Sequence, residues 1–85
     1  KDGFRIQVMF LSDFTKAKEI EAEINLKLKD HDHLVYVDFY SPNFRIRVGD
    51  FESRDDARKS LKLMKDIGYP DAFLVPDKIK IQLEN

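Results

Sequence analysis

Two alternating segments of the sequence carry side chains that could bind a ligand. In residues 4–10, Arg5, Gln7 and Met9 alternate with apolar residues, and in residues 44–48 Arg45 and Arg47 do the same. Side chains two positions apart in a strand point to the same face of a sheet. Guanidinium groups grip carboxylates through paired hydrogen bonds, while an amide both donates and accepts. The spacing therefore predicts a polar binding face built on two strands.

A third alternating segment, residues 35–40, adds two aromatic side chains. Tyr36, Asp38 and Tyr40 alternate with three apolar residues. An exposed antiparallel face normally carries some charge, so arginines alone would be compatible with an ordinary solvated surface. Tyrosine rings add an apolar platform bordered by donors, on which sugar C–H groups can stack while hydroxyl and acyl groups accept hydrogen bonds. The combination favours a sugar-binding face.

The pairing of this segment with residues 44–48 determines which arginine is available to bind a ligand. We expect Tyr40 opposite Arg45 and Asp38 opposite Arg47, with a four-residue loop, because a two-residue Ser41-Pro42 turn suits neither of the favoured primed hairpin turns. Arg47 would then pair with Asp38. Arg45 would keep its donors for a ligand and dominate binding.

Other chemistries find little support in the sequence. His31 and His33 flank Asp32, but no third or fourth ligand is recognisable nearby, so we interpret them as solvated loop histidines that titrate near neutrality. Gly49 and Asp50 could form an anion-binding turn, but nearby acidic residues favour a simple turn glycine. No nucleophile elbow or phosphate-binding glycine loop occurs. We expect no catalysis, no metal and no cofactor.

The elements that must position these residues follow an internal repeat at a spacing of 40, in which residues 4–8 are echoed by residues 44–48. Each repeat is a strand followed by a helix. The first helix begins near Asp13 or Thr15, and the second is capped by Ser53 and stopped by Gly68 and Pro70. A strand follows in residues 73–75, and residues 79–83 could form a further one. The order βαββαβ predicts a ferredoxin-like α+β fold, with both helices on one face of a four-stranded antiparallel sheet.

The inward positions of the repeats and of the hairpin give the expected core. It comprises Phe4, Ile6, Val8, Ile24, Val37, Ile46, Val48, Leu61 and Met64. Phe10 and Phe39 share the inward parity of their strands, which leaves the other sheet face open for a ligand.

Composition narrows the classes of protein. The 85 residues fit one domain spanning the whole chain, and 42% hydrophobic residues suffice for a core. A net charge of −1 argues against nucleic acid as a partner. The longest apolar run, residues 8–11, is far too short to cross a bilayer. The chain begins with Lys1 rather than with a signal peptide, so we expect a piece of a longer precursor.

Several segments resemble the SPOR (sporulation-related) domain. They are residues 4–8, 44–51, 53–57 and 72–75. Gln7 in the first strand and the motif from Arg47 to Phe51, followed by a serine-capped helix carrying Ala57, are the most specific parts. The resemblance covers nearly the whole chain. Met9 departs from it, because many members carry glycine at this position.

The resemblance implies a non-catalytic module that binds peptidoglycan glycan strands lacking their stem peptides. It implies a bacterial protein of the cell envelope, in the periplasm, whose parent is targeted to division sites. Loss of the stem peptide exposes a lactyl carboxylate that arginine can grip. We expect a monomer. The predicted glycan-binding residues are Arg5, Gln7, Met9, Tyr36, Tyr40, Arg45 and Arg47.

Two other functions remain open for this fold. An ACT-like small-molecule sensor would use a subunit interface, for which the exposed pair Ala22 and Leu26 could serve. A single-stranded RNA binder would use sheet aromatics, but the central strands lack the aromatic-rich pattern of such sheets and the net charge is unsuitable.

Overall fold

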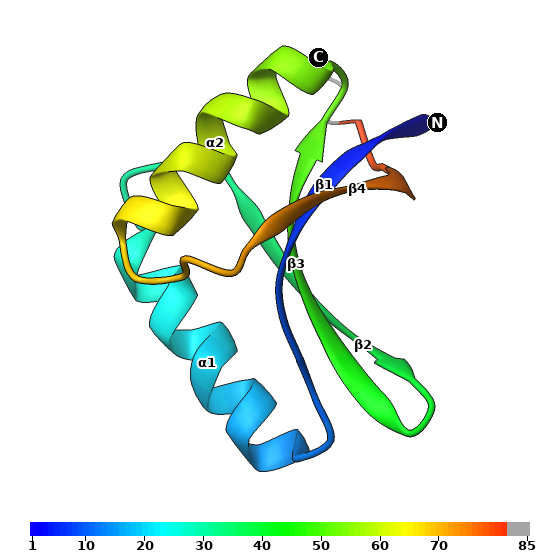
Figure 1. Ribbon diagram of the computed structural model, residues 1–85, viewed down its shortest axis with the longest axis vertical. Helices are drawn as coiled ribbons and strands as arrows, with labels where there is room; N and C mark the ends of the chain where they lie inside the picture. The colour runs from blue at the N-terminus through cyan, green and yellow to red at the C-terminus, as the bar shows by residue number, and fades with distance from the viewer. Residues whose placement is uncertain (82–85) are drawn as a thin grey trace.

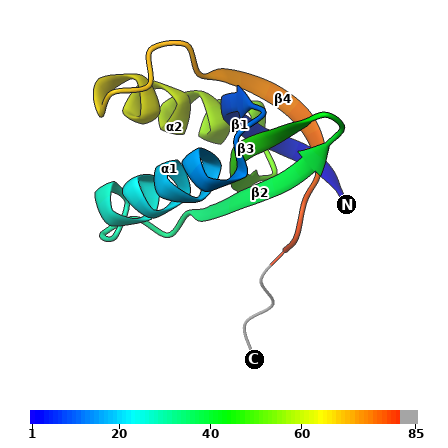
Figure 2. The same cartoon turned by 90° about the horizontal axis from the view of Figure 1, so that it is seen from below.

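The computed structural model describes residues 1–81 and shows a single sheet with two helices on one face (Figure 1). The elements are β1 (Asp2–Leu11), α1 (Phe14–Lys27), β2 (Leu34–Tyr40), β3 (Asn43–Phe51), α2 (Arg54–Asp66) and β4 (Phe73–Lys78). The strand order is β2-β3-β1-β4, and all neighbours are antiparallel. The βαββαβ order and the ferredoxin-like arrangement are confirmed. Figure 2 shows both helices on the same side of the sheet.

Both helices begin at the polar residues that the sequence indicates. The Asp13 side chain accepts a hydrogen bond from the backbone N–H of Lys16 at 3.0 Å, and Ser53 accepts one from Asp56 at 3.1 Å. Each bond satisfies a backbone donor that the helix itself leaves unpaired. After α2, Gly68 adopts a positive φ of 121°, which a residue with a side chain rarely adopts. Neither helix in the described residues is long and apolar enough to cross a membrane.

The core lies between the sheet and the helices. Ile6, Ile24, Ile46, Val48 and Met64 are fully buried there. Of the other expected core residues, Val8 is buried, while Phe4, Val37 and Leu61 are partly buried against the cluster. The cluster also includes residues outside the predicted set, among them Phe51, Tyr69 and Ala72. The interior positions are therefore set mainly by strand alternation and helix periodicity.

A β-bulge in β1 reverses the expected faces of two residues. Gln7 lies opposite Arg47, whereas Met9 lies opposite Ile46, so β1 contains one extra residue between these pairs. A bulge shifts the alternation of every side chain beyond it. Met9 consequently packs against the core, and Phe10 turns to the opposite face, where its ring is 6.5 Å from that of Tyr40. The expected placement of both residues was wrong.

The hairpin between β2 and β3 has a different register from the expected one. Asp38 lies opposite Arg45 and Tyr36 opposite Arg47, while Ser41 and Pro42, joined by a cis peptide bond, form a two-residue turn. The expected register had excluded a two-residue turn here because Ser-Pro fits neither of the primed hairpin turns. The register places opposite charges face to face and brings a second cross-strand pair, Phe39 and Phe44, to a ring distance of 5.1 Å. Phe39 faces the expected side but is exposed.

The chain after β4 is not a further strand within the described residues. β4 runs continuously from Phe73 through Pro76 to Lys78, and residues 79–81 have no strand conformation. Residues 82 and 83, which belong to the possible fifth strand, lie outside the described residues. Ile79 is nevertheless buried, although it is not part of the core cluster beneath the helices.

Candidate ligand-binding face

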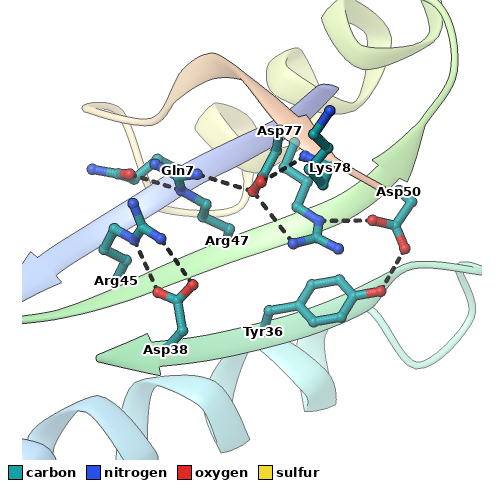
Figure 3. A network of polar contacts seen from close by, with 9 residues as sticks. Gln7, Tyr36, Asp38, Arg45, Arg47, Asp50, Asp77 and Lys78 are labelled. Carbon is teal, nitrogen blue, oxygen red and sulfur yellow. Dashed lines mark hydrogen bonds and ion pairs between the residues drawn. The ribbon is translucent and has the colours of Figure 1, made fainter. Parts of the chain in front are cut away.

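The sheet face opposite the helices, here called the open face, gathers six of the seven predicted site residues. Figure 3 shows polar side chains from all four strands linked across this face. Met9 is absent from it because of the bulge in β1. The predicted residues on the open face are Arg5, Gln7, Tyr36, Tyr40, Arg45 and Arg47.

One part of the open face, the covered half, is built from Arg5, Tyr36, Asp50 and Asp77. Arg5 Nε donates to Asp50 Oδ1 at 2.7 Å, and its guanidinium lies 3.9 Å from the centre of the Tyr36 ring. The Tyr36 hydroxyl donates to the other oxygen of Asp50. The Arg5 and Asp50 side chains are only 11% and 6% exposed. These groups therefore hold one another and offer little surface to a ligand.

The charges of the covered half stabilise one another electrostatically. Burial acts to lower the pKa of the Arg5 guanidinium, but the hydrogen bond and charge of Asp50 outweigh it and raise this pKa above its ordinary value. Burial and the same carboxylate also raise the pKa of the Tyr36 hydroxyl. Both groups stay protonated across the physiological pH range.

Gly49 makes room for the Arg5 side chain. It lies within β3 rather than in a turn, which corrects the expectation of a turn glycine. A Cβ atom at this position would come within 2.8 Å of Arg5 Cγ. The neighbouring Asp50, which argued against an anion-binding turn, instead supplies the carboxylate that holds Arg5.

Arg47 is bonded to Gln7 and to Asp77 of the covered half. Its Nε donates to Gln7 Oε1 at 2.9 Å, and its Nη1 donates to Asp77 Oδ2, also at 2.9 Å. The same Asp77 oxygen accepts a hydrogen bond from Arg5 Nη1 at 3.3 Å. Burial acts to raise the pKa of Asp77, but the hydrogen bond from Arg47 and the two guanidinium charges lower it overall. Arg47 is thus committed to internal partners, although Asp38 is not one of them.

The other part of the open face, the hairpin half, consists of Phe10, Asp38, Tyr40 and Arg45. Arg45 donates from Nε and Nη2 to the two oxygens of Asp38 at 2.9 and 3.0 Å, so the expectation that Arg45 has no internal partner was wrong. Its guanidinium lies 4.6 Å from the Tyr40 ring centre. Tyr40 is 58% exposed and Phe10 48% exposed. This half presents an ion pair beside a pair of accessible aromatic rings.

Four residues of the open face were not predicted there from the sequence. Asp50 was missed because a second register shift, between the pairs Phe4–Phe51 and Ile6–Val48, interrupts the alternation of β3. Phe10 was missed because the bulge in β1 changes its parity. Phe73 and Asp77 lie opposite Gln7 and Gly3 in the register of β4 with β1, and Phe73 is exposed. Extending the last predicted strand through Pro76 would have placed both on the open face by simple alternation.

The histidine pair lies away from the open face. His31 is exposed as expected, but His33 is half-buried, with its ring 5.3 Å from that of Phe51 and its Nε2 3.2 Å from Ser60 Oγ. Burial lowers the pKa of His33. Residues 1–81 contain no group of three or more potential ligands placed to hold a metal ion.

Comparison with known proteins assigns the family. The family model of the SPOR domain matches residues 1–76, so the chain belongs to the SPOR domain family. Its fold is similar to the solution structure of the peptidoglycan-binding domain of the B. subtilis cell wall lytic enzyme CwlC. The TM-score is 0.75 at 17% sequence identity, and 92% of each chain is covered. Among curated proteins, none matches the chain in sequence.

Proposed function

We propose that the open face binds peptidoglycan glycan strands that have lost their stem peptides. The observation that carries the proposal is the hairpin half, where the exposed Phe10 and Tyr40 rings lie 6.5 Å apart and the guanidinium of Arg45 lies over the Tyr40 ring. Membership of the SPOR domain family supports it. The similar domain of CwlC is described as peptidoglycan-binding, which agrees with this choice of ligand.

The chemistry of the hairpin half suits both parts of a denuded glycan. Removal of the stem peptide leaves a lactyl carboxylate, which a guanidinium can bind through charge-assisted hydrogen bonds. A guanidinium has five N–H donors, of which Asp38 accepts two. The remaining donors of Arg45 can serve a ligand while its ion pair with Asp38 stays formed. The two exposed rings supply stacking surface for the sugars.

In this proposal the domain binds its ligand and catalyses no reaction. Its residues form an interlocked set of ion pairs rather than a nucleophile and its base. It would bring a longer exported parent protein to sites in the cell envelope, in the periplasm, where stem peptides have been removed, such as division sites. Each copy would bind as a monomer.

A retention assay with isolated cell walls tests the proposal. Purified protein is mixed with intact sacculi and with sacculi whose stem peptides have been removed by an amidase, and bound protein is measured after sedimentation. We expect preferential retention on the amidase-treated sacculi. Equal retention on both, or retention on neither, would contradict the proposed ligand.

A pair of arginine variants assigns the binding to the hairpin half. Arg45→Ala should weaken binding to treated sacculi about ten-fold, the scale of a lost hydrogen bond to a charged group. Arg58→Ala is the matched control, because it removes the same charge from an exposed position on α2. Equal binding by the two variants would place the glycan elsewhere.

A further inference from the structure

The short segment after β4, residues 79–81, crosses the open face at the end opposite the hairpin turn. Figure 2 shows it leaving β4 on the side of the sheet away from the helices. The backbone N–H of Ile79 donates to the carbonyl of Lys1 at 2.8 Å. This bond fixes the start of the segment against the first residue of the chain.

Ile79 anchors the segment on β1. Gly3 has the same parity as Arg5 and therefore faces the open side of the sheet, where the absence of a side chain leaves space. A Cβ atom on Gly3 would lie 2.4 Å from Ile79 Cδ1, so the isoleucine fills the place that a side chain would take. Ile79 is only 6% exposed. The segment is thus packed on the sheet at its first residue, while Lys80 and Ile81 are exposed.

The next residue of the segment, Lys80, lies over β2. Its Nζ lies 5.5 Å from the centre of the Tyr36 ring, which Arg5 also contacts. A hollow of about 230 Å³ remains beneath the segment, and its lining includes Leu34, Gly49 and Asp50. The segment therefore passes over β1, β3 and β2 in turn and covers the end of the face that holds the Arg5 and Asp50 pair.

We propose that residues 79–81 form a fixed boundary of the glycan-binding face and determine how much of a glycan strand the domain can contact. The inference rests on the function proposed above. With the segment in place, Tyr36 and Arg5 are withheld from the ligand, and the glycan contacts only the hairpin half. Displacement of Lys80 exposes the Tyr36 ring as an additional stacking surface for a longer strand.

Lys80→Ala tests the boundary, with Lys78→Ala as its matched control. Both variants remove one lysine charge, but Lys78 pairs with Asp2 at the edge of the sheet and does not contact the Tyr36 ring. Affinities are measured by calorimetry for the shortest denuded glycan that the wild type binds and for one several disaccharides longer. Lys80→Ala should bind the longer glycan about five-fold more tightly, the scale of one added aromatic contact, and the shorter one unchanged. Lys78→Ala should change neither affinity.

Two results would overturn the boundary. Weaker binding of both glycans by Lys80→Ala would make Lys80 a direct ligand contact instead. Identical affinities for the two lysine variants would show that the segment does not limit the site.

A measurement without ligand separates this inference from the proposed function. A soluble paramagnetic agent should broaden the Tyr36 ring protons of the wild type less than those of Tyr40, and Lys80→Ala should increase the broadening of Tyr36. Equal broadening of both rings in the wild type would refute the covering of Tyr36. A wild type that passes this measurement but binds neither glycan would refute the proposed function alone.

Discussion

The two halves of the open face hold arginine on a sheet in opposite ways. In the covered half, Arg5 and Asp50 are nearly buried, and Asp50 also accepts the hydroxyl of Tyr36. In the hairpin half, Arg45 and Asp38 form an ion pair in which the two side chains are 23% and 49% exposed. A buried ion pair makes the structure depend on both partners, whereas an exposed pair adds little stability. The same residue types therefore maintain the fold at one end and remain available to a ligand at the other.

The largest effect should follow loss of the buried carboxylate. Asp50→Asn is expected to lower the free energy of unfolding by about 2 to 4 kcal/mol, because Arg5 keeps its charge but loses its nearest anion. Urea unfolding followed by circular dichroism measures the change. Asp38→Asn is the counterpart in the hairpin half and should cost less than about 1 kcal/mol. Equal losses for the two variants would remove the distinction between the halves.

The two arginines of β3 should differ in the same direction. Arg47→Ala is expected to destabilise the fold by about 1 to 2 kcal/mol, because it leaves the half-buried Gln7 and Asp77 without a shared donor. Arg45→Ala, which frees only the exposed Asp38, should cost less than about 1 kcal/mol. Thermal unfolding of both variants gives the ranking. A larger loss for Arg45→Ala would mean that the hairpin half also supports the fold.

Acid should weaken the fold through Asp77. The pKa of Asp77 in the folded protein lies below its ordinary value of 3.8, so the unfolded chain binds more protons in the range between the two. Its contribution to stability is complete above the unfolded pKa and is lost as the pH falls through the folded pKa. Unfolding curves below about pH 5 should show this loss, and Asp77→Asn should reduce the slope.

Asp38 provides the comparison for the acid experiment. The hydrogen bond from Arg45 also lowers the pKa of Asp38, but solvent screens this exposed pair. Asp38→Asn should therefore change the slope less than Asp77→Asn does. The reverse order would place the stronger electrostatic coupling in the hairpin half.

The smallest expected effect concerns affinity. Asp38 leaves three donors of Arg45 for a ligand, but its negative charge offsets the positive charge that attracts a ligand carboxylate. Asp38→Asn should raise the affinity for denuded glycan about two- to five-fold. Asp55→Asn is the control, since it removes an equal charge from an exposed position on α2. Weaker binding by Asp38→Asn would show instead that Asp38 orients Arg45 or contacts the sugar.

The fold could be predicted because its signals are local. Ser53 and Asp13 mark the helix starts, and the alternation around Ile6 and Ile46 identifies the buried face of the central strands. These signals depend on capping and on side-chain period, which a single segment displays by itself. The echo of residues 4–8 in residues 44–48 then gives the order of the elements.

The sequence predicted which residues form most of the site, but not which of them contact one another. Those contacts depend on how the strands pair, and strand pairing is not a local property of one segment. The bulge in β1 places Phe10 rather than Met9 on the open face, and the two-residue turn places Asp38 opposite Arg45 rather than opposite Arg47. Each change is a shift of one or two residues in register, which alters every contact beyond it. Both registers place Asp38 opposite an arginine, so facing charges do not distinguish them; the facing aromatic pair Phe39 and Phe44 was the available signal for the correct hairpin.

The pairing of every open-face arginine with an aspartate also affects how the domain meets its ligand. Arg5, Arg45 and Arg47 are matched by Asp50, Asp38 and Asp77, so the positive and negative fields largely cancel a few ångströms above the sheet. Long-range attraction would then contribute little to encounter, and the association rate should change little with ionic strength. Such a face would recognise a carboxylate only at contact distance. It would diffuse past other anionic polymers without being held by them.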